Sequence, residues 1–298
     1  MARCLVTGHR GYIGSRLFKA LQDDGHEVAG IDLKDGVDIN SLQGLSEDTE
    51  GLFHPHWIDF DPEYIFHLAC IPRVGYSIEN PVETMKNNVV ATSTVLNFAR
   101  KNNVKRVIYS SSSSIRGDGF GPKSPYALQK LTSETECRIY SDIYGLDTVS
   151  LRYFNVYSSD QKAEGSYATA VSNWMEYIRN HKTPFITGDG NQRRDMLHVE
   201  DAISANIFAM KFDGTFDGKN YDVGTGKNIS LNEVREIVEV YFPNLKFDYV
   251  EERLGDVNFT IALTLPLKEL GWKSERSIEQ GLNECFSNLK KEFKNDKV

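Results

Sequence analysis

The sequence predicts an α/β protein built on a doubly wound parallel sheet, and two patterns in its first half lead to this prediction. Short segments rich in β-branched and aromatic residues lie at residues 4–7, 27–32, 57–60, 64–69, 104–110 and 148–152. Between several of them, apolar residues recur with the helical period, as at Ile13, Leu17 and Leu21 and again at Val89, Leu96 and Ala99. Strands that alternate with helices pair in parallel through right-handed crossovers, so we expect helices on both faces of the sheet.

The loop after the first expected strand carries a phosphate-binding pattern. It reads Thr7-Gly8-His9-Arg10-Gly11-Tyr12-Ile13-Gly14, with the spacing G-x-x-G-x-x-G. Such glycines let the backbone turn sharply and approach a pyrophosphate that rests on the N-terminus of the following helix. The spacing differs slightly from G-x-G-x-x-G, and glycines serve many tight turns. The strand before and the helix after nevertheless favour a Rossmann-type dinucleotide site.

Asp32 supports the same interpretation. It ends the second expected strand, where a carboxylate accepts hydrogen bonds from a ribose 2′-hydroxyl and repels a 2′-phosphate. The alternative is that Asp32 only caps a loop. Together with the glycine pattern, it predicts NAD rather than NADP as the cofactor.

The second half of the chain predicts a smaller α/β lobe. Beyond about residue 160 the alternation loosens, and we expect amphipathic helices over residues 232–240 and 278–293. We therefore predict an NAD-binding Rossmann domain over residues 1–158, to which later segments near 194–226 return. Residues 159–298 are expected to form a substrate-binding lobe.

Composition limits the kinds of partner. The 298 residues are 40% hydrophobic and carry a net charge of −8, which argues against a nucleic-acid or anionic-membrane surface and favours a small-molecule partner. The four cysteines are far apart with no C-x-x-C, so free thiols are expected rather than disulfides or a metal site. No apolar run approaches the ~20 residues of a membrane span. Since the N-terminus also lacks the pattern of a signal peptide, we expect a cytoplasmic protein.

Tyr126 and Lys130 form the most informative side-chain pair of the sequence. They follow the serine run 110–114 and are four residues apart, so a helix would place them on one face. A fixed positive charge favours the phenolate, which lowers the pKa of tyrosine from its usual value of about 10. The same spacing also occurs on solvated helix faces, so the pair alone leaves both possibilities open.

With these residues in place, the chain resembles the extended short-chain dehydrogenase/reductases, and among them the NAD-dependent nucleotide-sugar epimerase/dehydratase family, in particular UDP-sugar 4-epimerases. The resemblance extends over almost the whole length. Matching segments are residues 7–14, Asp59, 67–69, 80–89, 110–112, Tyr126 with Lys130, 151–157, 194–199, 221–226, 253–257 and 270–272.

The resemblance implies roles for individual residues. Tyr126 matches the acid/base tyrosine, Lys130 the lysine that lowers its pKa and binds the nicotinamide ribose, and Ser112 the serine that binds the reacting hydroxyl. The implied cofactor contacts are Gly8, Arg10, Gly11, Tyr12, Ile13, Gly14, Asp32, Asp59, Phe60, Leu68, Ala69, Asn88, Tyr126 and Lys130. The implied substrate contacts are Ser112, Tyr126, Asn155, Arg194, Arg253 and Asp256, of which Asn155 and the two arginines match positions that hold a nucleotide diphosphate.

The resemblance also implies a homodimer through helices around residues 88–100 and 125–143. Neighbouring polar residues have simpler interpretations. Ser110 and Ser111 are expected to pack at a strand end, His198 to be structural and Arg193 to be solvated. For Arg194 and Arg253 the alternative is an ordinary surface ion pair.

The implied reaction is a transient oxidation at C4 of a nucleotide-diphosphate sugar, with Tyr126 taking the hydroxyl proton while C4 gives hydride to NAD. A dehydratase of this family has an Asp-Glu pair after the serine or threonine, where this chain has Ser113 and Ser114. The sequence therefore favours 4-epimerisation of a UDP-hexose, UDP-N-acetylhexosamine or UDP-uronate. A dehydratase and a keto-sugar reductase remain the alternatives.

Departures from the family pattern bear on the sugar. Arg116 stands where the family usually has tyrosine, and the segment 117–123 is shorter than usual. Arg116 is expected either to meet an acidic sugar such as a uronate or to pair with a carboxylate. Thr260, a small residue, hints at room for an N-acetyl group. Gln129 replaces a common serine beside Lys130.

Overall fold

The computed structural model describes residues 1–40, 60–161, 169–252 and 257–295. The chain divides into two compact units. Unit 1 comprises residues 1–112, 124–152 and 203–221, and unit 2 comprises residues 113–123, 153–202 and 222–298. Each unit is therefore assembled from segments that are distant in the sequence.

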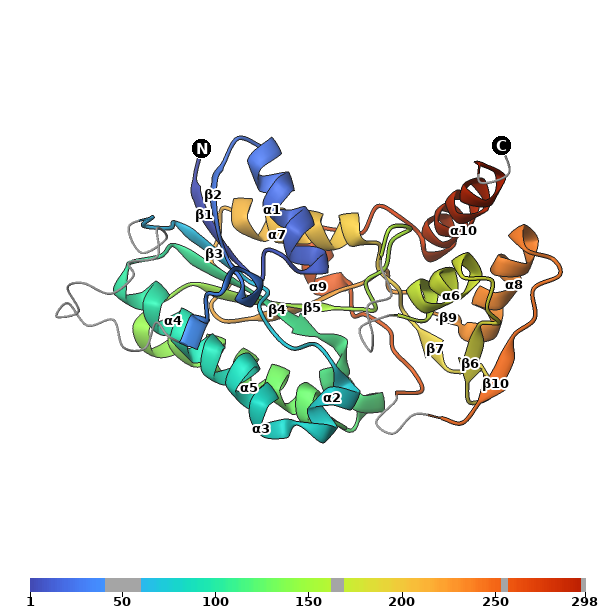
Figure 1. Ribbon diagram of the computed structural model, residues 1–298. Helices are drawn as coiled ribbons and strands as arrows, with labels where there is room; N and C mark the ends of the chain where they lie inside the picture. The colour runs from blue at the N-terminus through green and yellow to red at the C-terminus, as the bar shows by residue number, and fades with distance from the viewer. Residues whose placement is uncertain (41–59, 162–168, 253–256, 296–298) are drawn as a thin grey trace. The chain divides into compact units, whose positions relative to one another are not determined.

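Unit 1 is built around a six-stranded sheet (Figure 1). Its strands are β1 (Arg3–Thr7), β2 (Glu27–Ile31), β3 (Tyr64–His67), β4 (Arg106–Ser112), β5 (Thr148–Tyr153) and β8 (Asn220–Val223), in the order β2-β1-β3-β4-β5-β8. The pairs β1-β2, β1-β3 and β3-β4 are parallel. The doubly wound parallel sheet predicted from the sequence is confirmed. Strand order reverses beside β1, and ligands of such sheets bind at the carboxyl ends of the strands at this point.

One of the strand predictions is displaced in the structure, and another is not tested by it. The strand expected over residues 104–110 is β4, two residues later, so Ser112 is its last residue rather than a loop residue beyond it. The strand expected over residues 57–60 falls mostly outside the described residues.

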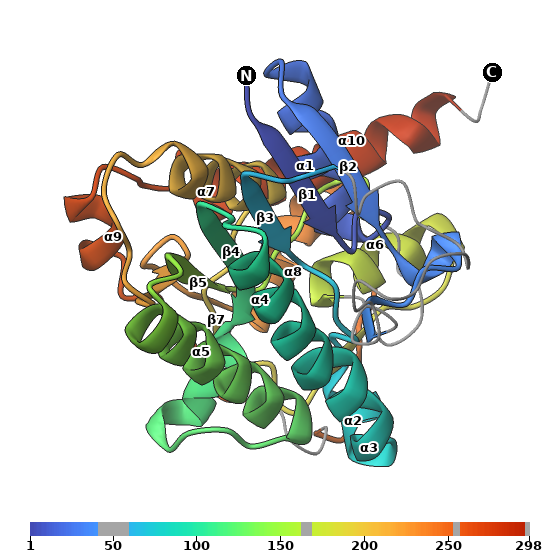
Figure 2. The same ribbon diagram turned by 90° about the vertical axis from the view of Figure 1, so that its left-hand side faces the viewer.

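Helices cover both faces of the sheet. In both views α1 (Tyr12–Asp23) and α7 (Val199–Lys211) lie on one side of the strands, and α4 (Ala91–Lys101) and α5 (Pro125–Tyr144) run next to each other on the opposite side (Figures 1 and 2). The core between them is closely packed and apolar, with Leu5, Ile65, Leu96 and Val107 at most 2% exposed. Shorter elements of this unit are η1 (Leu33–Asp35), α2 (Val74–Glu79), α3 (Pro81–Met85) and the π-helical turn η3 (Lys86–Val90).

Helix α5 has strong start and stop signals. The Ser124 hydroxyl accepts a hydrogen bond from the Ala127 amide at 3.2 Å, and Pro125 occupies the first helical turn. Gly145 ends the helix in the left-handed region, with φ of 67°. These signals fix where the helix begins, and therefore where the two residues predicted to be catalytic stand on it.

Unit 2 has its own apolar core. The helices α6 (Ala170–Arg179), α8 (Leu231–Tyr241) and α10 (Ile278–Asn295) enclose Trp174, Met175, Val234, Leu282 and Phe286, all at most 2% exposed. Strands β6 (Phe185–Thr187) and β10 (Asp248–Val250) pair in parallel, and β7 (Arg193–Arg194) pairs antiparallel with β9 (Ile229–Ser230). The turn η4 (Ser113–Gly119) and α9 (Leu265–Glu269) complete the unit. The helices expected over residues 232–240 and 278–293 are confirmed.

Within the described ranges, no helix combines the length and the apolar character that crossing a membrane requires.

Candidate active site

The glycine loop joins β1 to α1 with very little space around its backbone. Gly8 has φ of 74°, and a Cβ atom on it would lie 2.8 Å from the Ala69 amide nitrogen. A Cβ on Gly14 would lie 2.1 Å from the Gly8 carbonyl oxygen. Gly11 is the N-cap of α1, with Tyr12 and Ile13 as its first residues. The loop therefore runs close to neighbouring backbone and leads directly into the N-terminus of a 12-residue helix, which suits a pyrophosphate.

Asp32 is held beside this loop. Its carboxylate accepts hydrogen bonds from the Arg10 amide at 3.0 Å and from the Lys34 amide at 2.9 Å. Because each oxygen takes a single backbone donor, both keep a lone pair for ribose hydroxyls. The glycine loop and this carboxylate fit NAD.

Other predicted cofactor residues lie on neighbouring segments. Leu68 and Ala69 follow β3, and their amides bind the Thr7 carbonyl and the Thr7 hydroxyl, each at 3.2 Å. Phe60 is half-buried and packs against the apolar core of unit 1. Asp59 lies outside the described residues.

The Asn88 side chain is engaged by other parts of unit 1. Its amide oxygen accepts from the Ile71 amide at 2.7 Å, and its nitrogen donates to the Ile71 carbonyl at 3.2 Å and to Gln129 Oε1 at 2.8 Å. Asn88 is 2% exposed. It therefore fixes the backbone that follows β3.

The three residues predicted to be catalytic come together in unit 1. The Ser112 hydroxyl, at the end of β4, is hydrogen-bonded to the Tyr126 phenol. Tyr126 and Lys130 lie one turn apart on α5, and the Lys130 ammonium is 6.0 Å from the centre of the Tyr126 ring. Lys130 is 2% exposed and donates to the Ser110 carbonyl at 2.6 Å. A buried cation is thus fixed next to a phenol.

The pKa of Tyr126 is raised to about 12, whereas the sequence predicts a lowered value. The largest cause is burial, which disfavours the phenolate; the positive charge of Lys130 and the hydrogen bond from Ser112 act in the lowering direction. The sequence-based prediction is correct about the effect of Lys130 and wrong about the direction of the net shift.

A buried ion pair supports the end of β4, and sequence reasoning missed it. Ser111 donates to Glu134 Oε1 at 2.5 Å, and Arg152 binds the same carboxylate through Nε at 2.8 Å and Nη2 at 2.6 Å. Glu134 stands one helical turn after Lys130. Charged residues on the buried faces of an expected helix and strand were the available signal.

His67 is another buried polar residue to which the sequence assigns no role. It lies at the end of β3, 1% exposed, with Nδ1 2.7 Å from the Thr7 hydroxyl and Nε2 3.1 Å from the Thr92 hydroxyl. Because Thr92 donates its own proton to the Asn88 carbonyl, His67 Nε2 must be the donor to Thr92. Burial, with a smaller contribution from Lys130, lowers the pKa of His67 to about 3, so the ring is neutral.

Unit 2 contains a pocket of about 170 Å³ that brings two predicted substrate residues together. Asn155 and Arg194 line it with polar and aromatic side chains, among them Thr187, Gln192, Trp174 and Phe185. Such a mixture suits a ligand with a flat ring and charged groups. Arg253 and Asp256 lie outside the described residues.

Asp195 organises the backbone beside this pocket. One carboxylate oxygen accepts from the Thr225 amide and hydroxyl, and the other from the amides of Gly226 and Ala262, at 2.7–3.1 Å. The Asn155 side chain donates to the Asp195 carbonyl at 2.7 Å. Asp195 is fully buried, and burial raises its pKa despite these donors.

Arg116 is paired rather than free. Its Nη2 lies 2.5 Å from a carboxylate oxygen of the buried Asp222, which also accepts from the Leu263 amide. This outcome matches the second of the two interpretations given for Arg116. Arg193 forms an ion pair with Glu233 at 2.8 Å and donates to Asn228, so it is bound to the fold rather than simply solvated.

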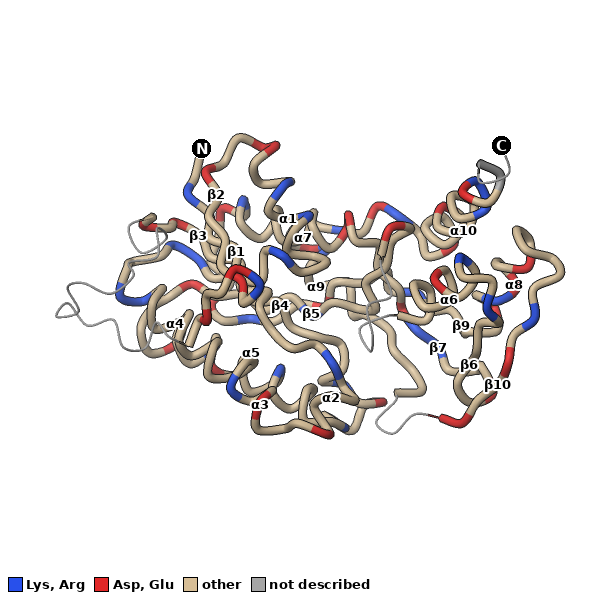
Figure 3. Tube along the Cα trace, in the orientation of Figure 1, with Lys and Arg blue, Asp and Glu red and all other residues tan. Residues whose placement is uncertain are grey.

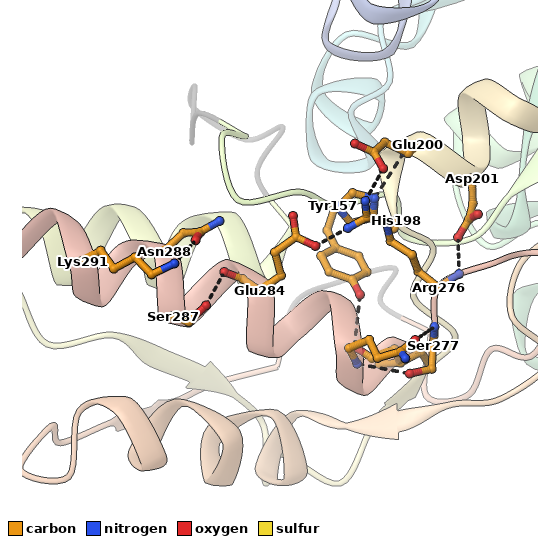
Figure 4. Close-up of polar contacts among 12 residues, drawn as sticks. Tyr157, His198, Glu200, Asp201, Arg276, Ser277, Glu284, Ser287, Asn288 and Lys291 are labelled. Carbon is orange, nitrogen blue, oxygen red and sulfur yellow. Dashed lines mark hydrogen bonds and ion pairs between the residues drawn. The ribbon is translucent and has the colours of Figure 1, made fainter.

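His198 is structural, as expected. Its Nδ1 accepts from the Glu200 amide at 3.4 Å, and its ring meets Tyr157 edge to face at 5.7 Å. Figure 4 shows Arg276 beside it, bound to Glu200 and to Glu284. Burial and the Arg276 charge lower the pKa of His198.

Comparison with known proteins agrees with this geometry. The NAD dependent epimerase/dehydratase family matches residues 4–224. A putative UDP-glucose 4-epimerase of Methanocaldococcus jannaschii is 30% identical, over 96% of this chain and 98% of its own. A UDP-N-acetylglucosamine 4-epimerase from Methanobrevibacter ruminantium, solved with UDP-N-acetylmuramic acid, is 31% identical with a TM-score of 0.83, covering 96% and 97% of the two chains.

A UDP-glucuronic acid 4-epimerase from Bacillus cereus, solved with UDP-glucuronic acid and NAD, is 26% identical with a TM-score of 0.82, covering 97% and 99%. The three relatives are thus named for three different sugars. All three are named as 4-epimerases. This chain belongs to the NAD dependent epimerase/dehydratase family, and it is an enzyme whose cofactor is NAD.

Proposed function

We propose that this protein is a 4-epimerase of UDP-sugars. The observation that carries the proposal is the side-chain set around the end of β4: Ser112, Tyr126 and Lys130 are present, while Ser113 and Ser114 follow. Removal of water from the sugar requires an acid and a base that exchange protons near neutral pH, as carboxylates in a suitable environment do. Serine hydroxyls do not, so an oxidation begun at C4 has no route to dehydration through these two positions.

The residues of unit 1 would move one proton and hold one oxygen. When bound, NAD supplies a positively charged ring that takes a hydride from a sugar carbon and later gives it back. Tyr126 would take the proton from the 4-hydroxyl and return it at the end of the cycle. Ser112 would hold the same oxygen. The fixed charge of Lys130 would favour the phenolate form, which Tyr126 needs before it can take the proton.

The pocket of unit 2 would hold the nucleoside diphosphate. Arg194 supplies a guanidinium, which remains charged and binds phosphate oxygens in a bidentate manner. Phe185, which is partly exposed, offers aromatic surface for the base, and the Asn155 side chain that lines the same pocket is anchored on the Asp195 carbonyl. Arg253 and Asp256 are proposed to contribute further contacts to the substrate.

A neutral sugar is favoured over a uronate. The ion pair with Asp222 compensates the charge of Arg116, the cation that the sequence offers for a sugar carboxylate. Freeing it would leave Asp222 buried without its partner, which is costly. We therefore place UDP-hexoses and UDP-N-acetylhexosamines ahead of UDP-glucuronate.

The direct test is to incubate the protein with NAD and, separately, UDP-glucose, UDP-galactose, their N-acetylhexosamine counterparts and UDP-glucuronate. The C4 epimers are then resolved by NMR. Epimer formation from at least one neutral sugar, with no net change in NADH absorbance, is the expected outcome. Absence of a C4 epimer from all five would contradict the proposal, and accumulation of NADH in amounts comparable to the sugar would identify a net oxidoreductase instead.

We further propose that the protein is a homodimer through the exposed face of α5, as expected, and of α3. Helix α3 replaces the helix expected around residues 88–100, because residues 88–99 are buried or half-buried. Leu128, Ile139 and Ile143 recur at helical spacing on α5 and are 50%, 39% and 67% exposed. Val82 and Met85 of α3 are 71% and 39% exposed. A helix face with this much exposed apolar side chain is typical of an interaction surface, and a second copy of the same face would cover it.

A further inference from the structure

A second acidic residue, besides Asp32, lies at the glycine loop. Asp35 is the last residue of η1, the short turn that follows β2. Its Oδ1 lies 2.5 Å from Arg10 Nη2, and its Oδ2 lies 3.2 Å from His9 Nε2. One carboxylate therefore binds two side chains of the loop that would carry the pyrophosphate. Figure 3 shows that acidic and basic residues are interspersed along the trace rather than gathered in one segment. The charge at a binding site therefore depends on local ion pairs such as this one.

Arg10 also contacts Asp32, through its backbone. Its amide donates to Asp32 Oδ2 at 3.0 Å, and its carbonyl accepts from the Lys34 ammonium at 3.5 Å. In dinucleotide sites, the carboxylate at the end of the second strand binds the ribose hydroxyls of NAD, whereas a nearby arginine accommodates the 2′-phosphate of NADP. This chain carries both kinds of side chain at the same place. They favour opposite cofactors.

The structure pairs Arg10, the side chain that would suit NADP, with the carboxylate of Asp35. We propose that Asp35 is a second determinant of cofactor specificity, because its pairing with Arg10 keeps that guanidinium from serving a 2′-phosphate. Asp32 and Asp35 together balance the charges of Arg10 and Lys34. Removing the Asp35 carboxylate would leave an excess of positive charge beside the ribose position, and a guanidinium side chain that is already 56% exposed could then turn to a phosphate.

The test is a binding measurement that needs no sugar. NAD⁺ and NADP⁺ are each titrated by calorimetry into protein freed of co-purified nucleotide, for the wild type, Asp35→Asn and the double variant Arg10→Ala/Asp35→Asn. We expect Asp35→Asn to raise the affinity for NADP⁺ at least about tenfold, while the affinity for NAD⁺ changes by less than about threefold. The double variant should lose the gain.

A matched control removes the same charge elsewhere in unit 1. Asp23 pairs with Lys19 at the C-terminal end of α1, at 2.7 Å, so Asp23→Asn should leave the ratio of the two affinities unchanged. The inference is overturned if Asp35→Asn leaves NADP⁺ binding as it was, if the double variant keeps the gain, or if Asp23→Asn produces an equal gain. A wild type that binds both cofactors equally would overturn it as well. Because no sugar is involved, these outcomes are independent of the 4-epimerase proposal.

Discussion

Asn88 and Gln129 are hydrogen-bonded to each other through their buried side-chain amides, at 2.8 Å. Gln129 also donates to the Thr84 hydroxyl at 2.9 Å, and it stands beside Lys130 on the helix that carries Tyr126. The pair thus ties the helix of the proposed catalytic residues to η3 and, through Asn88, to the backbone at Ile71. Gln129, which departs from the family pattern, is therefore integrated into the core rather than exposed.

Replacing Gln129 by leucine should lower the free energy of unfolding by about 1–3 kcal/mol, because buried polar groups of Asn88 and Thr84 each lose a partner. Urea-induced unfolding followed by circular dichroism measures the change. The control is Asp142→Asn on the same helix, where the side chain is 57% exposed and the expected change is within about 0.5 kcal/mol. Equal stability of Gln129→Leu and the wild type would contradict the importance of this network.

Replacing Tyr126 by phenylalanine should reduce kcat by about 10²- to 10⁴-fold, the usual contribution of a positioned acid or base. Affinity for the UDP moiety should stay close to that of the wild type, because the pocket that would hold it lies in unit 2. The two quantities are measured by the NMR epimerisation assay and by calorimetry with UDP. Tyr144→Phe, at a 49% exposed position of the same helix, is the control and should be fully active. Near-normal turnover of Tyr126→Phe would remove Tyr126 from the assigned role.

These features differ in how far the sequence could reveal them. The glycine loop, the position of Asp32 and the placement of Tyr126 and Lys130 one helical turn apart depend on residues close together in the chain, and their patterns predicted them correctly. The pairing of Arg116 with Asp222 joins residues 106 positions apart, and two candidate partners, a sugar carboxylate and a protein carboxylate, suit an arginine equally well. The direction of the net pKa shift of Tyr126 could not be predicted from the sequence either. A charge at i+4 is visible in the sequence, but the burial that outweighs it depends on the whole packed unit.

His67 should make the protein sensitive to mild acid. Its pKa is about 3 when folded and about 6.5 when unfolded, so between these values the unfolded chain binds the extra proton and stability falls as the pH falls. One such group contributes about 1 kcal/mol per pH unit between about pH 6 and 5. Unfolding free energies measured over this range should therefore show a smaller slope in His67→Asn than in the wild type, whatever the absolute stability of the variant. His181→Asn, at an exposed position, should keep the wild-type slope. An identical slope in all three proteins would contradict the assignment of a neutral buried imidazole.

Ile143→Glu should convert the proposed homodimer into a monomer. Ile143 is 67% exposed on the apolar face of α5, so a carboxylate there is tolerated in the free chain but would have to be buried without a partner in the dimer. Light scattering coupled to gel filtration at micromolar concentration measures the mass directly. Phe120→Glu is the matched control, because Phe120 is 91% exposed but belongs to the segment 113–123 of unit 2 rather than to α5. A dimeric wild type and Phe120→Glu beside a monomeric Ile143→Glu would locate the interface on this face. A monomeric wild type, or a dimer that survives Ile143→Glu, would exclude it and leave the exposed side chains of α3 and α5 in need of another partner.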